Sequence, residues 1–335
     1  MFVEAGQAPE AVRAQLARNA DAMGELGRIL RERAPRSVVT CARGSSDHAA
    51  TFAKYLIEAY TGLLTSSAAP SVSSIYEART HVRDTLFIAI SQSGKSPDLL
   101  AATQNAKDNG ALTVALCNNA AAPLMEIVDM AIPLHAGPET SIAATKSYVA
   151  SLSAIVHLVA SWTQNDELST ALLGAPDRLA RAWECDWSRA VDTLWAAINL
   201  FVIARGFGLG IAQEAALKLK ETCGLHAEAF SAAEVKHGPM ALVRAGFPVL
   251  MFAQDDDTRE GIEDLARELC ARGATVMLAG AKAEPALSLE TIAAHPVIEP
   301  MLRVQSFYRM AEALARARGF DPDRPPHLNK VTETL

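Results

Sequence analysis

The sequence lacks several features that would assign it to a common class of protein. No uninterrupted apolar run approaches the length that crosses a membrane. The N-terminus, with Glu4 and Gln7, has neither a basic segment nor an apolar core of a signal peptide, so we expect a cytoplasmic protein. Positive charge is not in excess, because 31 Lys and Arg face 38 Asp and Glu, a net charge of −7. That balance argues against a nucleic acid or an acidic membrane as the main partner, although a local pocket can still bind an anionic small molecule.

Metal-ligand and disulfide patterns are also missing. The eight histidines are dispersed without an H-E-x-x-H motif, so we expect no metal and no cofactor. The cysteines are odd in number and form no C-x-x-C pair, which is typical of small buried side chains in a reducing compartment. They are Cys41, Cys117, Cys185, Cys223 and Cys270.

What the sequence does contain is an alternation of short apolar strands and longer helices. A length of 335 residues suggests about two domains. Buried strands are predicted in both halves, at 37–41, 85–90, 112–116 and 127–134, then at 200–204, 249–253 and 275–278. Helices are predicted at 8–32, from the break after residue 47 to 59, and at 96–109, 213–224, 259–272 and 302–318. This alternation indicates α/β domains, each with a parallel sheet flanked by helices.

The two halves resemble each other. Cys41-Ala42-Arg43-Gly44 and Ile203-Ala204-Arg205-Gly206 each end the first strand of a half, about 160 residues apart. Chance likeness of two ordinary strand–turn–helix units is the alternative, but the matched order of several elements favours an internal duplication. We therefore predict a helical segment over 1–34, a first domain over 35–170, a helical connector over 171–194 and a second domain over 195–335. Ligands of open parallel sheets bind at the carboxyl ends of the strands, where the polar clusters lie.

Two glycine motifs fail on spacing. Gly94-Lys95-Ser96 would end a P-loop only if position 89 were glycine, and it is Ala89. The run that starts at Gly206 has Ile211 where a dinucleotide-binding fingerprint requires its third glycine.

The segment from Ser91 to Ser96 nevertheless predicts a phosphate site. Ser91, Gln92, Ser93 and Ser96 place hydroxyls and an amide at a strand-to-helix turn, where free amides and the helix dipole favour an anion. Simple capping of the helix by serine is the alternative. One serine would suffice for a cap, so the group favours phosphate binding, to which the hydroxyls of Ser45 and Ser46 could contribute.

Acid–base candidates occur in the second half. Glu214, Lys218 and Glu221 are spaced at i, i+4 and i+7 and share one face of a predicted helix. A solvated face with an ordinary ion pair is the alternative reading. Glu221, flanked by Lys218 and an apolar stretch, is a plausible base. His237, in a polar loop with Gly-Pro after it, is a candidate proton shuttle, although a lone histidine is more often not catalytic.

Together these residues resemble the sugar isomerase (SIS) family, and specifically the isomerase half of glucosamine–fructose-6-phosphate aminotransferase. The resemblance covers nearly the whole chain from Arg43. The motifs that carry it are Ser91-Gln92-Ser93-Gly94, Ala143-Ala144-Thr145-Lys146, the Glu214–Glu221 stretch, His226-Ala227-Glu228, Glu234–Pro239 and Asn329-Lys330-Val331-Thr332.

The resemblance implies two tandem SIS domains, each a flavodoxin-like three-layer sandwich, and assigns roles to single residues. Glu221 would be the base that moves a proton between C1 and C2, and His237, from the neighbouring subunit of a homodimer, would open the sugar ring. Lys330 would lie over the active site in the C-terminal tail, and Lys218 would be a further catalytic group. The substrate-binding residues would be Ser45, Ser46, Ser91, Gln92, Ser93, Ser96, Ile142 and Glu214.

The departures from the aminotransferase suggest a narrower activity. Position 2 is Phe2 rather than the nucleophilic cysteine of a glutaminase, so we expect no ammonia supply from glutamine. The 43–49 and 330–335 segments look most like the stand-alone deaminases, which convert glucosamine 6-phosphate to fructose 6-phosphate and ammonia. Galactosamine 6-phosphate or a fructosamine 6-phosphate adduct as substrate, or a non-catalytic phosphosugar-binding regulator, are the alternatives. Lys95 replaces an acidic residue of the aminotransferase, with an unknown effect on substrate preference.

Overall fold

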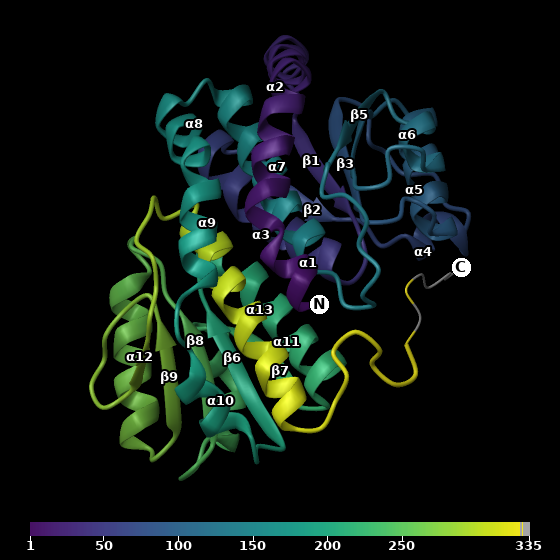
Figure 1. The fold of residues 1–335 in the computed structure, drawn as a ribbon. Coiled ribbons are helices and arrows are strands. Elements are labelled where there is room, and N and C mark those ends of the chain that lie inside the picture. Colours follow the sequence, from purple (N-terminus) through teal and green to yellow (C-terminus); the bar gives the residue numbers. More distant parts are fainter. Residues whose placement is uncertain (329, 331–335) are drawn as a thin grey trace. The chain divides into compact units, whose positions relative to one another are not determined.

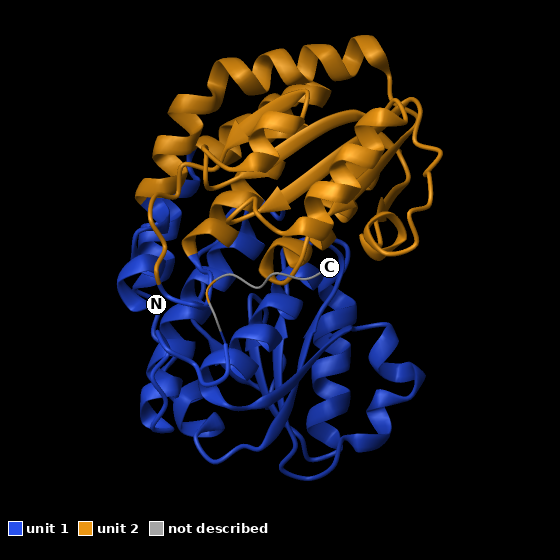
Figure 2. Ribbon diagram, turned by 90° about the vertical axis from the view of Figure 1, so that its right-hand side faces the viewer, with its two compact units in different colours: residues 1–9, 141–145, 174–328 blue, residues 10–140, 146–173, 329–335 orange. Residues whose placement is uncertain are grey.

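The computed structural model describes residues 1–328 and 330, and its elements are labelled in Figure 1. The chain divides into two compact units, shown in different colours in Figure 2. Unit 1 comprises residues 1–9, 141–145 and 174–328, and unit 2 comprises residues 10–140 and 146–173 together with Lys330. Two short segments from the first half, residues 1–9 and 141–145, are counted with unit 1. The predicted domain limits of 35–170 and 195–335 stay a prediction.

The sheet of unit 2 has five parallel strands in the order β2-β1-β3-β4-β5. Its central strand, β3, is buried at every residue, as expected for an apolar run covered on both faces. The bounds are β1 Ser37–Cys41, β2 Thr65–Ser67, β3 Thr85–Ser91, β4 Leu112–Cys117 and β5 Met130–Pro133.

Helices cover both faces of this sheet. On one face, Leu99 and Ala102 of a helix pack on Phe87 and Ala89 of β3. The alternate residues of β3 point to the opposite face, where two other helices pack against each other. The helix on the first face is α5 (Pro97–Asp108), with α4 (Ser71–Ser74) and α6 (Pro123–Ile127) beside it. The helices of the second layer are α3 (Ser45–Thr61) and α7 (Lys146–Thr163); α2 (Ala8–Arg33) and α8 (Asp166–Leu173) complete the unit.

Unit 1 contains the second parallel sheet, in the order β10-β9-β8-β6-β7. One face packs on the apolar side of a single helix through Ile262 and Leu265, and a helix pair covers strands β6 and β7. The strands are β6 Asn199–Ala204, β7 His226–Ser231, β8 Pro248–Phe252, β9 Thr275–Ala279 and β10 Leu287–Leu289. The helices are α12 (Arg259–Ala271) on the first face and α11 (Leu209–Cys223) with α13 (Glu299–Ala317) at the other; α1 (Phe2–Gly6), α9 (Ala175–Trp183) and α10 (Ser188–Leu194) pack against α13.

Both sheets have the same topology. In each, the first strand of the unit lies between the second and the third, and the fourth and fifth follow outward, which is the 2-1-3-4-5 order of flavodoxin-like sheets. The predicted fold class, two α/β domains with parallel sheets flanked by helices, is therefore confirmed. In this topology the ligand site lies beyond the carboxyl ends of the first and third strands, where the chain direction around the sheet reverses.

The prediction missed three of the four edge strands. β2, β7 and β10 were not predicted, because two are three residues long and β7 carries exposed side chains, including His226 and Glu228, at alternate positions. The predicted strand at 127–134 was partly wrong, since Ile127 ends α6 and β5 begins at Met130. Among the described residues, no helix combines the length and the apolarity that a membrane crossing requires.

Candidate functional site

The loop that follows β3 is built around a glycine that no other residue could replace without strain. The backbone N–H of Gly94 donates to Oγ of Ser91 at 2.9 Å, which closes a tight turn. Gly94 has φ of +64°, and a Cβ there would lie 2.5 Å from Cβ of Ala122 and 2.8 Å from Sγ of Cys117. The loop therefore turns into α5 with its backbone pressed against the next strand.

Ser96 occupies the position immediately before α5. It is the N-cap residue by backbone conformation, yet its hydroxyl makes no capping hydrogen bond to the first turn. The capping explanation for this serine is therefore not what the structure shows. Its hydroxyl can therefore donate to a ligand, whereas Pro97 has no N–H and the N–H of Leu99 donates to Oδ1 of Asp98 at 2.7 Å.

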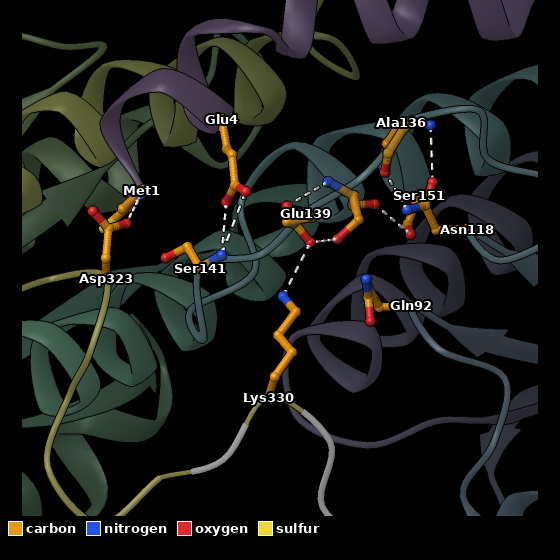
Figure 3. A network of polar contacts seen from close by, with 12 residues as sticks. Met1, Glu4, Gln92, Asn118, Ala136, Glu139, Ser141, Ser151, Asp323 and Lys330 are labelled. Carbon is orange, nitrogen blue, oxygen red and sulfur yellow. Dashed lines mark hydrogen bonds and ion pairs between the residues drawn. The ribbon is translucent and has the colours of Figure 1, made fainter.

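A pocket of about 380 Å³ opens beside this loop within unit 2. Figure 3 shows Gln92, Asn118, Glu139 and Lys330 around it. Asn118 shapes one wall, because its Oδ1 accepts from the N–H of Ala136 and its Nδ2 donates to the carbonyl of Gly137, both at 2.9 Å. The lining residues are Gln92, Ser93, Lys95, Asn118, Asn119, Gly137, Pro138, Glu139 and Lys330.

Glu139 and Lys330 form an ion pair at this pocket. Nζ of Lys330 lies 3.8 Å from Oε2 of Glu139, whose side chain is buried. A dashed line in Figure 3 marks this ion pair. The carboxylate also accepts from the N–H and the hydroxyl of Ser147, at 3.2 and 2.6 Å. A buried carboxylate held in this way attracts an ammonium group to the side of the loop after β3. The structure thus brings the predicted residues Gln92, Ser93 and Lys330 together.

Ser45 and Ser46 begin α3, directly after β1. Gly44 before them has φ of +55°, and Arg43 donates to the buried carboxylate of Asp98 in α5 at 2.7 Å. Burial raises the pKa of Asp47 in the first turn of α3, with His48 and Arg43 opposing that shift. The two serines are half-buried and do not line the 380 Å³ pocket, nor do Ser91 and Ser96. Their contact with a ligand stays a prediction.

The acid–base candidates lie on α11 of unit 1. Nζ of Lys218 is 2.5 Å from Oε2 of Glu221 and 3.6 Å from Oε1 of Glu214. Glu214 and Lys218 are essentially buried, whereas 20% of the Glu221 side chain is exposed. The i, i+4, i+7 spacing therefore produces a buried ion-pair network rather than the solvated helix face that was the alternative reading.

The other two candidates of unit 1 have fewer contacts. His237 ends a short 3-10 turn (Glu234–His237) after β7 and is exposed. The N–H of Ile142 donates to the carbonyl of Asp323 at 3.5 Å. Glu221 lies in the last turn of α11, far from the end of β6, so the strand-end rule that located the other polar clusters does not account for its position.

Sequence reasoning missed three polar residues at these two sites. Asn118 directly follows β4, so the strand-end rule could have found it. Glu139 follows Gly137-Pro138, a turn signal that gave no hint of burial. Tyr308, whose hydroxyl donates to Oε1 of Glu214 at 3.1 Å, lies in an apolar helix and left no signal in the sequence.

Comparisons with known proteins identify the family of this chain. The family model of the SIS domain matches residues 33–161 and 193–302. The glutamine–fructose-6-phosphate aminotransferase (isomerizing) of Symbiobacterium thermophilum is 33% identical over 357 residues, which cover 98% of this chain and 58% of that protein. The chain spans about half the length of several such aminotransferases that it matches.

Two solved structures superpose closely on this chain. A protein of Silicibacter pomeroyi DSS-3, provisionally described as a phosphosugar isomerase, has a TM-score of 0.93 and 44% identity over 96% of this chain and 99% of its own. The C-terminal domain of glucosamine–fructose-6-phosphate aminotransferase from Francisella tularensis has a TM-score of 0.87 and 26% identity, over 96% of this chain and 97% of its own.

Proposed function

Because the chain belongs to the SIS domain family, we propose that it is an enzyme of phosphorylated amino sugars. Its reaction would be the conversion of glucosamine 6-phosphate and water to fructose 6-phosphate and ammonia. The observation that carries the proposal is the pair formed by Lys218 and Glu221, in which a buried ammonium group holds a partly exposed carboxylate at 2.5 Å. A carboxylate held in place is the base that an aldose–ketose interconversion requires.

The phosphate of the substrate would bind at the loop after β3. The hydroxyls of Ser93 and Ser96 lie on this loop, and Lys95 and Lys330 line the adjoining pocket. Phosphate binding at this loop would not depend on the amino group or on the configuration of the sugar. It therefore supports a 6-phosphosugar and leaves the identity of the sugar to experiment.

The proton steps follow from the chemistry of the sugar. His237 would help to open the ring, which frees the C1 aldehyde. Glu221 would remove the proton from C2, giving an enolamine, and return it to C1, giving the imine of fructose 6-phosphate. Water then adds to that imine and ammonia leaves, so the atoms balance without an oxidant or a second substrate.

Ammonia release from glucosamine 6-phosphate and from galactosamine 6-phosphate tests this proposal. We expect release from the glucosamine substrate and a loss of at least about a hundredfold in Glu221→Gln, the usual scale of a general base. Glu260→Gln, an exposed carboxylate in the first turn of α12, is the matched control and should turn over normally. Undiminished turnover of Glu221→Gln would remove the assigned base.

Two other outcomes would replace the proposed reaction. Ammonia from galactosamine 6-phosphate alone would move the specificity to the other epimer. Tight binding of fructose 6-phosphate, with no ammonia released from either hexosamine, would favour a phosphosugar-binding regulator over an enzyme.

A further inference from the structure

A buried tyrosine of α13 contacts the acid–base network of α11. Helices α11 and α13 lie side by side in unit 1 (Figure 1). The side chain of Tyr308 is fully buried, and its hydroxyl donates to Oε1 of Glu214 at 3.1 Å. The same oxygen of Glu214 is the one that Lys218 approaches at 3.6 Å. One carboxylate oxygen thus faces both a neutral donor and a cation.

The four groups form a sequence that runs from the interior towards solvent. Tyr308 contacts Glu214, Glu214 contacts Lys218, and Lys218 contacts Glu221, which is the member with appreciable exposure. Two carboxylates share one ammonium group, and the ammonium lies closer to Glu221, at 2.5 Å, than to Glu214, at 3.6 Å. A buried carboxylate keeps its charge only where donors compensate for lost hydration, and the hydroxyl of Tyr308 is one such donor to Glu214.

We propose that Tyr308 is a positioning residue for the base. By donating to Glu214, its hydroxyl meets part of the hydrogen-bonding requirement of that carboxylate and leaves Lys218 directed at Glu221. Without the hydroxyl, Lys218 is drawn towards Glu214, and Glu221 loses the contact that orients it. The inference rests on the proposed role of Glu221 in proton transfer, and it adds to that role a residue from a distant part of the chain.

Kinetics of Tyr308→Phe test the proposal. We expect kcat to fall about tenfold, the scale of one hydrogen bond to a charged group, while KM changes little because phosphate binding does not involve α11. Ser306→Ala is the matched control, since it removes a buried hydroxyl of the same helix that donates to Ala182. If Ser306→Ala lowers kcat equally, or if KM rises in place of a fall in kcat, Tyr308 has only a structural role.

A double variant tests whether the tyrosine acts through Glu214. Residues of one network give non-additive effects, so adding Tyr308→Phe to Glu214→Gln should lower kcat little further. Fully additive losses would show that Tyr308 acts by another route. Exchange of the C1 proton of fructose 6-phosphate with solvent deuterium gives the same comparison for proton transfer alone, should ammonia release be absent.

A spectroscopic measurement separates this inference from the proposed function. Glutamate labelled with ¹³C at the carboxyl carbon reports the surroundings of each side chain, and the two Glu→Gln variants assign Glu214 and Glu221. We expect both resonances to shift together in Tyr308→Phe and to stay in place in Ser306→Ala. An unchanged Glu221 resonance in Tyr308→Phe would overturn the proposal even in a protein that releases ammonia.

Discussion

Several charged side chains of this protein are buried, and each of them has a partner of opposite charge. Lys218 is almost fully buried, and its ammonium group is compensated by two carboxylates of its own helix. Glu139 is likewise buried and receives two hydrogen bonds from Ser147 as well as the approach of Lys330. Removing one member of such a pair leaves a buried charge uncompensated, which costs about 3–5 kcal/mol. Variants of these residues therefore need a measurement of folding beside that of activity.

His157 is a buried group that should make stability depend on pH. It lies on α7, its Nδ1 is buried without a partner among the described residues, and burial lowers its pKa from 6.5. The unfolded chain therefore binds a proton more readily than the folded chain, so the free energy of unfolding decreases as the pH falls below about 6.5.

Replacing this histidine should weaken that dependence. We expect His157→Gln to show a smaller loss of Tm between pH 7 and pH 5 than the original protein. His81→Gln, at an exposed histidine of the same unit, serves as the control and should keep the original slope. Equal acid slopes in both variants would show that His157 does not contribute.

At the scale of elements, the strand-to-helix loop after β3 combines a strained turn with the proposed phosphate site. The turn is closed by Ser91 and depends on a glycine at a left-handed conformation. The next serine, Ser93, lines the pocket, and Ser96 precedes α5 with its hydroxyl uncommitted to capping. The Ser91 hydroxyl and the Gly94 backbone thus maintain the shape of the loop, and Ser93 and Ser96 can donate to a ligand.

Gly94→Ala should damage this loop in two ways. The new Cβ would meet Ala122 and Cys117 at less than 3 Å and would also oppose the positive φ. We expect a loss of stability of about 1–3 kcal/mol and a rise in KM for the phosphosugar, measured by denaturant unfolding and by initial rates.

Gly62→Ala separates the two contributions. Gly62 has φ of +71° at the end of α3, but a Cβ added there would have no atom within 4 Å, so this variant carries the backbone strain alone. It should lose less stability than Gly94→Ala and keep its KM. A KM that rises equally in both would mean that the close packing at Gly94 is not what shapes the phosphate loop.

At the scale of the whole molecule, the two sheets have the same strand order but different loops. After β3 the chain reads Ser91-Gln92-Ser93-Gly94, whereas after β8, the corresponding strand, it reads Ala253-Gln254-Asp255-Asp256. Gln254 donates to the carbonyl of Arg205 and to Thr258, and Asp255 is paired with Arg259. Carboxylates in place of hydroxyls disfavour an anion, so we expect the phosphate to bind at the loop of unit 2 and not at the corresponding loop of unit 1.

A mixing experiment tests the homodimer that the family resemblance implies, with His237 supplied by the neighbouring subunit. Glu221→Gln and His237→Ala are each expected to be inactive. If a site takes these two residues from different chains, a mixed dimer contains one site with both residues intact and one with neither. Random exchange of subunits should then restore about a quarter of the original activity.

The control for this experiment is a mixture of Glu221→Gln with a Glu221→Gln, His237→Ala double variant. No dimer in that mixture contains an intact site, so mixing should restore no activity. Failure of the original pair to regain activity, with exchange verified by mass, would place both residues of a site in one chain.

Much of the fold was determined locally and could be predicted from the sequence. β3 and β4 are short apolar runs bounded by turn residues, and α2 and α12 show clear helical periodicity, so their limits were predicted to within a residue or so. The turn after β3 was also predictable, because its serines and its glycine lie within six residues. The edge strands β2 and β10 were not, since three residues carry too little pattern to outweigh neighbouring turns.

Local sequence alone was enough to specify the two parallel sheets, the tight turn after β3 and the shared helix face of Glu214, Lys218 and Glu221. Only the tertiary structure decided that this face is buried, that Glu139 meets Lys330, and that Tyr308 donates to Glu214. The physical reason is distance along the chain: the last two contacts join residues 191 and 94 positions apart, which no local pattern encodes. Local propensity and periodicity specify elements, whereas the partners of a buried charge depend on how those elements pack.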